Sequence, residues 1–215
     1  MRSNATSSDY TWLASDEFAV WQEVGYCFTH ITDATPGEVL TTLEAEQTFT
    51  VTGVDDLYIR AGEAWDARGG GPFGKTLVAA TAIGSTTLMV ESTGFIGVTA
   101  EHMEPLSRGR QIVSCYYALG LSQFWWWSNG TLELHFEPLA PGVGRTGTHP
   151  DNYLQDMSEV GLDVTDSRDV REIPFNAATL ALAERVTGTP IHPEMFHSNP
   201  FQLGLVQNAT PASGH

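Results

Sequence analysis

The stretch QFWWWSNGTLELHFEP, residues 123–138, places three consecutive tryptophans just before an Asn-Gly pair. Asn129-Gly130 is the strongest short signal for a two-residue hairpin turn, because both residues tolerate the positive φ that this turn requires. The aromatic and alternating residues on either side favour β-strands. The sequence therefore predicts a β-hairpin centred on this pair.

A two-residue turn also predicts which side chains of the hairpin share a face, because directly paired residues point to the same side of a sheet. The predicted pairs are Trp127 with Leu132, Trp125 with Leu134, and Gln123 with Phe136. One face is then almost wholly apolar and is expected beneath the helices: Trp125, Trp127, Leu132, Leu134 and Phe136. The opposite face combines aromatic and ionisable groups: Phe124, Trp126, Glu133, His135 and Glu137.

This mixed row has one structural and two functional interpretations. In the structural one, it is the solvated face of a half-exposed sheet. In the first functional one, it is a binding platform. Trp126 and Phe124 then form an apolar floor, Tyr117 of the preceding strand adds a ligand contact, and the ionisable groups add polar contacts.

The second functional interpretation is acid–base chemistry, with His135 as general base and Glu133 or Glu137 orienting its ring. Alternate residues of a strand lie roughly 6.7 Å apart, so the two glutamates are expected about 13 Å apart. They cannot both ligate a metal together with His135, and we expect no metal site. The sequence also lacks the G-x-S-x-G, H-E-x-x-H and paired C-x-x-C motifs, so it predicts no cofactor.

A glycine-rich segment, GGGPFGKT at residues 69–76, fits the phosphate-binding pattern G-x-x-x-x-G-K-[ST]. Such a loop must be followed by a helix, whose free N–H groups hold the phosphate. The residues after Thr76 are instead rich in β-branched side chains, and Gly84-Ser85 suits a two-residue turn. We therefore predict a strand hairpin and no nucleotide binding, with Lys75 as a surface cation.

The chain has 215 residues, with 26 acidic and 10 basic side chains and a formal net charge of −16. A field of that sign repels nucleic acid and anionic lipid, so neither a nucleic acid nor a membrane is an expected partner. We expect a small molecule or a basic protein, although an acidic surface also promotes solubility by itself. No apolar run has the length of a signal peptide or membrane span, and Cys27 and Cys115 suit buried thiols. These features predict a cytoplasmic protein.

Outward from the hairpin, further strands and helices are expected. TLVAATAI, TTLMVES and QIVSCYYAL indicate strands that precede the hairpin, and YCFTHIT at 26–32 indicates an earlier one. Helices are predicted at 9–23 and in TPGEVLTTL, THPDNYLQDMSEVG and NAATLALAERVTG. This order predicts an α+β fold, an antiparallel β-meander with helices packed on one face. Residues 1–206 are expected to form one domain and residues 207–215 a disordered tail.

Several blocks of the sequence resemble a known family: TPGEVLTTL, VESTGFIGV, FEPLAP, NYLQDMSEVGLD and ATLALAERVTG. They are similar to an uncharacterised family common in actinobacteria such as streptomycetes, and they span about 26–190. The resemblance implies a bacterial cytoplasmic protein, and it assigns no catalytic residue because the family has no established activity. The aromatic meander also resembles, in style of fold alone, immunity-type binding proteins of bacterial conflict systems.

The favoured hypothesis is a non-catalytic binding or interaction protein that uses the sheet face of Trp126 and His135. The alternative is a small natural-product tailoring enzyme that acts on an apolar or aromatic substrate, with His135 as general base. A nucleotide-binding protein that uses residues 69–76 is a third and less favoured reading.

Overall fold

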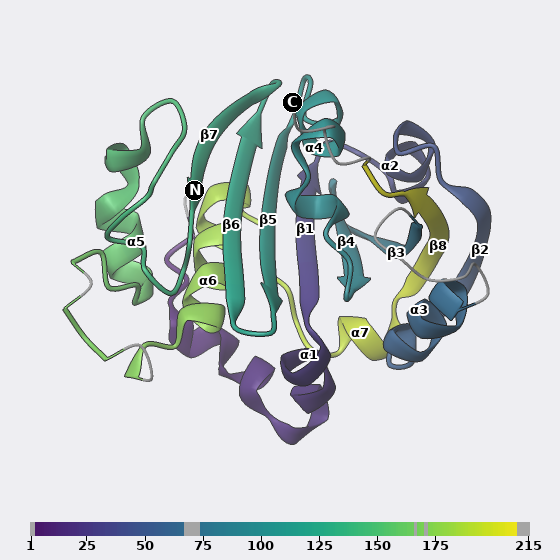
Figure 1. Ribbon diagram of the computed structural model, residues 1–215, viewed down its shortest axis with the longest axis horizontal. Helices are drawn as coiled ribbons and strands as arrows, with labels where there is room; N and C mark the ends of the chain where they lie inside the picture. Colours follow the sequence, from purple (N-terminus) through teal and green to yellow (C-terminus); the bar gives the residue numbers. More distant parts are fainter. Residues whose placement is uncertain (1–2, 67–73, 166, 170–171, 210–215) are drawn as a thin grey trace, which may run out of the picture.

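The computed structural model describes residues 3–66, 74–165, 167–169 and 172–209. Within them, eight strands form one open sheet in the order β2-β8-β3-β4-β1-β5-β6-β7, and every neighbouring pair is antiparallel (Figure 1). The strands are β1 Tyr26–Thr32, β2 Glu46–Thr52, β3 Lys75–Ile83, β4 Thr86–Ser92, β5 Gln111–Ala118, β6 Leu121–Ser128, β7 Thr131–Phe136 and β8 Pro200–Gln207.

Short helical segments connect these strands. The segments before β3 are η1 Ser7–Ala14, η2 Asp16–Phe18, α1 Ala19–Val24, α2 Pro36–Thr42 and α3 Leu57–Asp66. The later ones are η3 Ile96–Val98, α4 Ala100–Leu106, η4 Pro150–Tyr153, α5 Leu154–Val160, α6 Phe175–Thr187 and α7 Met195–Ser198. The predicted α+β class with an antiparallel sheet is confirmed.

The sheet is more than a meander, because two strands insert between others. β1 lies between β4 and β5, and β8 lies between β2 and β3. β8 occupies the end of the chain where the tail was predicted to start, and Gln207 is its last residue. Asn208, the next residue, is buried, and its Oδ1 accepts a 2.6 Å hydrogen bond from the Thr76 hydroxyl. The predicted tail is therefore wrong for these two residues, and residues 210–215 lie outside the described part.

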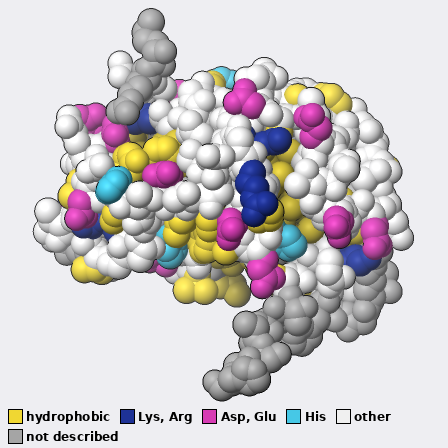
Figure 2. All heavy atoms as spheres, turned by 90° about the horizontal axis from the view of Figure 1, so that it is seen from above, with side chains coloured by type: hydrophobic (Ala, Val, Ile, Leu, Met, Phe, Trp, Pro, Cys, Tyr) yellow, Lys and Arg dark blue, Asp and Glu magenta, His cyan; other side chains and the backbone are white. Residues whose placement is uncertain are grey.

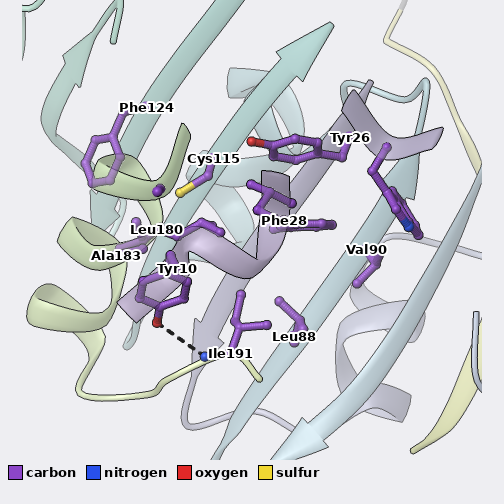
Figure 3. Close-up of a cluster of buried hydrophobic side chains, with 14 of the residues drawn as sticks. Tyr10, Tyr26, Phe28, Leu88, Val90, Cys115, Phe124, Leu180, Ala183 and Ile191 are labelled. Atoms are coloured by element: carbon purple, nitrogen blue, oxygen red, sulfur yellow. Dashed lines mark hydrogen bonds between the residues drawn. The ribbon is translucent and has the colours of Figure 1, made fainter. Parts of the chain in front are cut away.

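Helices cover both faces of the sheet, not one face as expected. On the first face, α6 crosses behind β5 and β6 in the view of Figure 1, and Leu180 packs with Phe28 and Phe124. Figure 3 shows Tyr10 and Leu180 close together in this core, to which Val90 also belongs. On the second face, Val39 of α2 and Met103 of α4 belong to a separate apolar cluster. The central strands carry apolar residues on both sides, so both sides require a cover.

The predicted hairpin forms, with positive φ of 48° at Asn129 and 79° at Gly130. Its register is correct at Trp127 and Leu132 and wrong further from the turn. The irregularity lies between Trp126 and Trp127, where Glu133 is the extra residue of β7. A bulge shifts all later pairs by one residue. The observed pairs are Trp126 with Leu134, Trp125 with His135, and Phe124 with Phe136.

The bulge reverses the predicted faces of β7. Leu134 and Phe136 lie on the first face together with Trp126 and Phe124, within the core beneath α6. His135 lies on the second face beside Trp125. The apolar side chains of β7 thus reach the larger core.

Candidate functional site

The three predicted ligand contacts share the first face of the sheet, but they differ in access. Phe124 is fully buried and stacks on Phe136, with ring centroids 5.0 Å apart. Tyr117 is half-buried and lies against Tyr26, with centroids 6.0 Å apart. Trp126 is also half-buried, so it and Tyr117 retain the access that a ligand contact needs.

The predicted catalytic residues lie apart from these aromatic side chains. His135 is on the opposite face, and its Nδ1 is 3.2 Å from the Thr146 hydroxyl. Partial burial lowers the pKa of His135 below its ordinary value, which favours the neutral ring near pH 7. Glu137 accepts hydrogen bonds from the Ser122 backbone N–H and hydroxyl. Thr146 therefore orients His135, in the place where a glutamate was expected.

Glu133, the third predicted catalytic residue, is the bulged residue of β7. Its carbonyl carbon and oxygen lie beneath Gly147, where an added Cβ would be 2.3 Å from the oxygen. The segment around Gly147 pairs with the outer edge of β7, through backbone hydrogen bonds of 2.9 Å between His135 and Thr146 in both directions. Glu133 thus belongs to a protected sheet edge, and no hydrogen bond within the described residues joins its carboxyl to His135.

A cavity of about 200 Å³ lies between the first face of the sheet and helices α5 and α6. Trp126 forms part of its wall, and the ring of Tyr153 meets it edge-on with centroids 4.8 Å apart. The lining residues are Gln111, Trp126, Leu134, Tyr153, Asp156, Leu182, Arg185 and Val186. Trp126 is the residue of the aromatic run in β6 that lines this cavity on the first face of the sheet.

One cationic side chain, Arg185 of α6, lines this cavity. Its Nε donates to the Ala5 carbonyl at 2.8 Å, and its Nη1 donates to Glu159 at 2.6 Å. Asp156 lies 3.7 Å from the same Nη1. The Arg185 side chain is only 11% exposed, so these carboxylates offset a charge that is largely removed from water.

The cavity wall also contains two buried polar atoms without a hydrogen-bond partner among the described residues. They are the Trp126 Nε1 donor and the Gln111 Oε1 acceptor. Gln111 lies opposite Ser128, so it is a diagonal neighbour of Trp126 on the same sheet face. A buried polar group without a partner costs about 1–3 kcal/mol, so such groups call for a structural or functional explanation.

The sequence contained one signal for this cavity. Leu182, Arg185 and Val186 are spaced three and four residues apart, so they share one face of α6. That face points at the sheet, and an arginine on it departs from the apolar pattern of a core helix. Gln111, Tyr153 and Asp156 also line the cavity, but they come from other segments of the chain. No sequence pattern indicated that they would lie beside Arg185.

A second buried ionisable group lies on the other face of the sheet. The Glu91 carboxyl accepts hydrogen bonds from the backbone N–H groups of Ile96 at 2.8 Å and Gly97 at 2.9 Å. Burial raises its pKa to about 7. Gly97 packs so closely that an added Cβ would lie 2.2 Å from the Thr29 hydroxyl. Glu91 thus anchors the η3 segment to the sheet.

The segment after the glycine-rich loop is a strand, as predicted. Lys75 begins β3, which turns at Gly84-Ser85 into β4, and Lys75 forms an ion pair with Glu46. Residues 69–73 of the loop lie outside the described part of the chain. A strand at this position provides no helix N-terminus for a phosphate.

Among the residues that the structure describes, no three His, Cys, Asp or Glu side chains are grouped so that they could hold a metal ion. Within the same residues, no helix has the length and apolar character needed to cross a membrane.

The fold and the cavity define an α+β protein with an open antiparallel sheet and a small aromatic pocket beneath helix α6. The chain belongs to a family of unknown function, DUF6461, whose sequence profile matches residues 3–211. This confirms the predicted membership of an uncharacterised family. No curated protein and no solved structure matches the chain.

Proposed function

We propose that this protein binds a small molecule in the cavity beside Trp126. The observation that carries the proposal is the cavity itself, about 200 Å³ in volume, with aromatic and aliphatic walls and a few polar groups. Ligand sites in proteins have this composition. The proposal keeps Trp126 as a ligand contact and replaces the His135 side of the predicted platform with side chains of α5 and α6.

The size of the cavity limits the ligand. A 150 Å³ apolar cavity accommodates benzene in an engineered protein, whereas sites for drug-sized ligands have about 300–1,000 Å³. A cavity of about 200 Å³ therefore suits one substituted ring or a similarly compact group. A larger ligand would leave its remainder outside.

The charged groups of the cavity favour binding over catalysis. Arg185 and Asp156 are the ionised side chains in its wall, and they are 3.7 Å apart. A general acid or base needs a proton that it can exchange near neutral pH. A guanidinium remains protonated throughout this range, so Arg185 cannot serve as that acid or base.

Indole N–H signals in nuclear magnetic resonance spectra test the proposal, because each of the six tryptophans gives its own signal. Trp126→Phe and Trp65→Phe would assign the cavity signal and an exposed control on α3. In a screen of single-ring compounds, we expect hits that shift the Trp126 signal and leave the Trp65 signal in place.

Val186→Phe serves as the blocking variant, since a larger side chain at this half-buried wall position fills the cavity. It should abolish the shifts while the fold, judged by the remaining spectrum, persists. Hits that bind the blocked variant equally well, or that shift other indole signals only, would refute the proposal.

A small enzyme with His135 as general base is a second proposal. It is favoured by the lowered pKa of His135, because a base must be unprotonated at working pH. Trp125, with its ring centroid 4.9 Å from that of His135, offers an apolar surface for an aromatic substrate. The test is to incubate the protein with cell extract and to follow the conversion of aromatic compounds. A conversion that His135→Ala abolishes and Trp126→Phe retains would favour this second function.

The setting of the protein is also proposed from its chemistry. Cys27 and Cys115 are both buried free thiols, which suits the reducing cytoplasm. An actinobacterial source remains a proposal from the resemblance of sequence blocks. A basic protein partner is a weaker proposal, because Figure 2 shows acidic side chains scattered over the upper face and not gathered in one patch.

A further inference from the structure

We propose that two copies of this chain pair edge to edge through β2, so that their two sheets become one continuous antiparallel sheet. β2 is the last strand at one end of the strand order, and Figure 1 shows it at the right-hand end of the sheet. This contact is separate from the cavity beside Trp126, whose strand residues lie on β5, β6 and β7 at the other end.

The two ends of the sheet differ in what covers them. At the β7 end, Thr146 exchanges backbone hydrogen bonds with His135, and the Thr148 N–H donates to the Leu132 carbonyl. At the β2 end, no segment of the described chain pairs with the outer side of the strand. Free N–H and C=O groups of an edge strand recruit other strands, so monomeric proteins usually block them with charges, prolines or a covering loop. The outer side of β2 is therefore a place at which a further strand can add.

The backbone groups that point outward from β2 follow from its pairing with β8. The Gly53 N–H donates to the Asn199 carbonyl at 2.9 Å, and the next pair joins Thr52 to Pro200, which has no N–H to donate. Hydrogen-bonded and non-hydrogen-bonded pairs alternate along an antiparallel ladder. Thr52 and Thr50 therefore turn their N–H and C=O groups away from β8, towards the free edge.

The strand is symmetric about Thr50, because residues 48–52 read TFTVT. An antiparallel pair centred on Thr50 places this residue opposite its own copy, where each N–H can donate to the C=O of the other. The same register places Phe49 of each copy opposite Val51 of the other, and Thr48 opposite Thr52. Aromatic residues opposite β-branched ones, and threonines opposite threonines, stabilise antiparallel sheets.

The side chains of this stretch favour a second copy as the partner. Phe49 is 47% exposed, although the residue that it pairs with in β8, Leu203, is fully buried. A second β2 would place Val51 beside this exposed ring. No residue in the range 47–54 is charged, so two chains of net charge −16 can meet there without bringing carboxylates face to face.

The backbone limits the pairing to the same residues in both copies. Gln47 and Gly53, with positive φ of 54° and 70°, lie just outside residues 48–52 at the two ends. Positive φ interrupts the extended backbone that a ladder needs. In the register centred on Thr50, Gln47 of each copy lies opposite Gly53 of the other, so both strands leave the ladder at the same points.

Sedimentation velocity of the full chain at increasing concentration tests the pairing. We expect a reversible dimer with a dissociation constant between about 1 μM and 1 mM, because a contact through one short strand is smaller than a standard interface. A chain that stays monomeric throughout this range would overturn the proposal and leave the free edge to a strand of a different protein.

Thr50→Lys and Thr50→Asp test the two-fold register. Each variant places two like charges directly opposite each other, so each should weaken the dimer by at least about tenfold. An equimolar mixture of the two variants pairs opposite charges and should dimerise at least as tightly as the unaltered chain. Charged side chains are tolerated on exposed edge strands, and circular dichroism verifies that both variants fold.

Thr131→Lys is the matched control, since it makes the same change of net charge at an exposed threonine of β7. It should leave the dimer unchanged. A dimer that neither Thr50 variant weakens, or that Thr131→Lys weakens equally, would overturn β2 as the contact. A mixture that associates no more tightly than the single variants would overturn the pairing centred on Thr50.

Discussion

Trp125 lies directly opposite His135 in the sheet, with ring centroids 4.9 Å apart and ring planes at 55°. Trp126, one residue further along, points to the other face and lines the cavity. Neighbouring tryptophans thus serve different surfaces, because successive side chains of a strand alternate. Substitutions on the two faces should therefore have separate effects.

The first prediction compares these faces. Phe124→Ala should lower the free energy of unfolding by about 3–5 kcal/mol, the usual result of removing a fully buried aromatic ring. His135→Ala should lower it by about 1 kcal/mol or less, because the half-buried ring gives up one hydrogen bond, to Thr146. Urea unfolding monitored by circular dichroism measures both. Equal losses would contradict the assignment of Phe124 to the core and of His135 to a half-buried position on the second face.

The second prediction concerns Glu91 and the loss of stability as the pH rises from 4.5 to about 7. Burial raises its pKa from 4.5 to about 7 in the folded protein. Folding is then favoured by this group below pH 4.5, and the contribution is lost as the pH rises through about 7. The loss is about 3 kcal/mol at most, from 1.36 kcal/mol per pKa unit. Glu91→Gln, which mimics the protonated carboxyl, should remove this part of the pH dependence. An unchanged slope between pH 4.5 and 7 in the variant would refute the raised pKa.

The third prediction concerns His30, whose burial lowers its pKa from 6.5 to about 4. The neutral ring stabilises the fold fully above pH 6.5, and this contribution is lost as the pH falls towards 4, again by about 3 kcal/mol. Between pH 4.5 and 6.5 this slope opposes that of Glu91. In Glu91→Gln the protein should therefore lose stability more steeply on acidification than the unaltered chain.

The same opposition supplies a control for both buried groups. His30→Leu should show the reverse change: its stability should fall more steeply than that of the unaltered chain as the pH rises from 4.5 to 7. The double variant should regain the weaker dependence of the original chain. Chemical unfolding at half-unit pH intervals gives all four curves, and a double variant that follows either single variant would show that the two effects are not independent.

The fourth prediction uses two glycines. Gly97→Ala should destabilise the protein by about 1–3 kcal/mol, because its Cβ would approach the Thr29 hydroxyl to 2.2 Å. Gly62→Ala on α3 meets nothing within 4 Å and should stabilise the protein by about 0.5–1 kcal/mol, since alanine favours helices. Thermal melts of both proteins test the pair. A stable Gly97→Ala protein would indicate that η3 packs less tightly on the sheet.

Local sequence signals predicted much of the fold. The Asn129-Gly130 turn, the strand after Lys75 and the fold class were all predicted. β2 and β8 were not. β2 is an edge strand whose residues are exposed apart from the half-buried Val51, so no alternation of buried apolar residues marks it. β8 pairs with β2 and β3, which are far away in the sequence.

The candidate site was predicted only in part. Trp126 was identified from its place in the aromatic run, but it was grouped with His135, which lies on the other face. One bulged residue, Glu133, is responsible, because a register shift of one residue moves every later side chain to the other side of the sheet. The bulge lies where the segment around Gly147 packs on the carbonyl of Glu133 at the strand edge. The hairpin sequence alone does not predict this contact, because the segment lies outside it.

The sequence by itself determined the elements that depend on neighbours along the chain. A turn forms at Asn129-Gly130 because two adjacent residues accept positive φ, and β3 forms because β-branched residues prefer extended backbone. Only the tertiary structure decided which faces these elements present and what closes over them. The cavity joins Gln111, Trp126 and Arg185 from β5, β6 and α6. Packing of distant segments has no local signature, because it depends on which apolar surfaces bury one another when the whole chain folds.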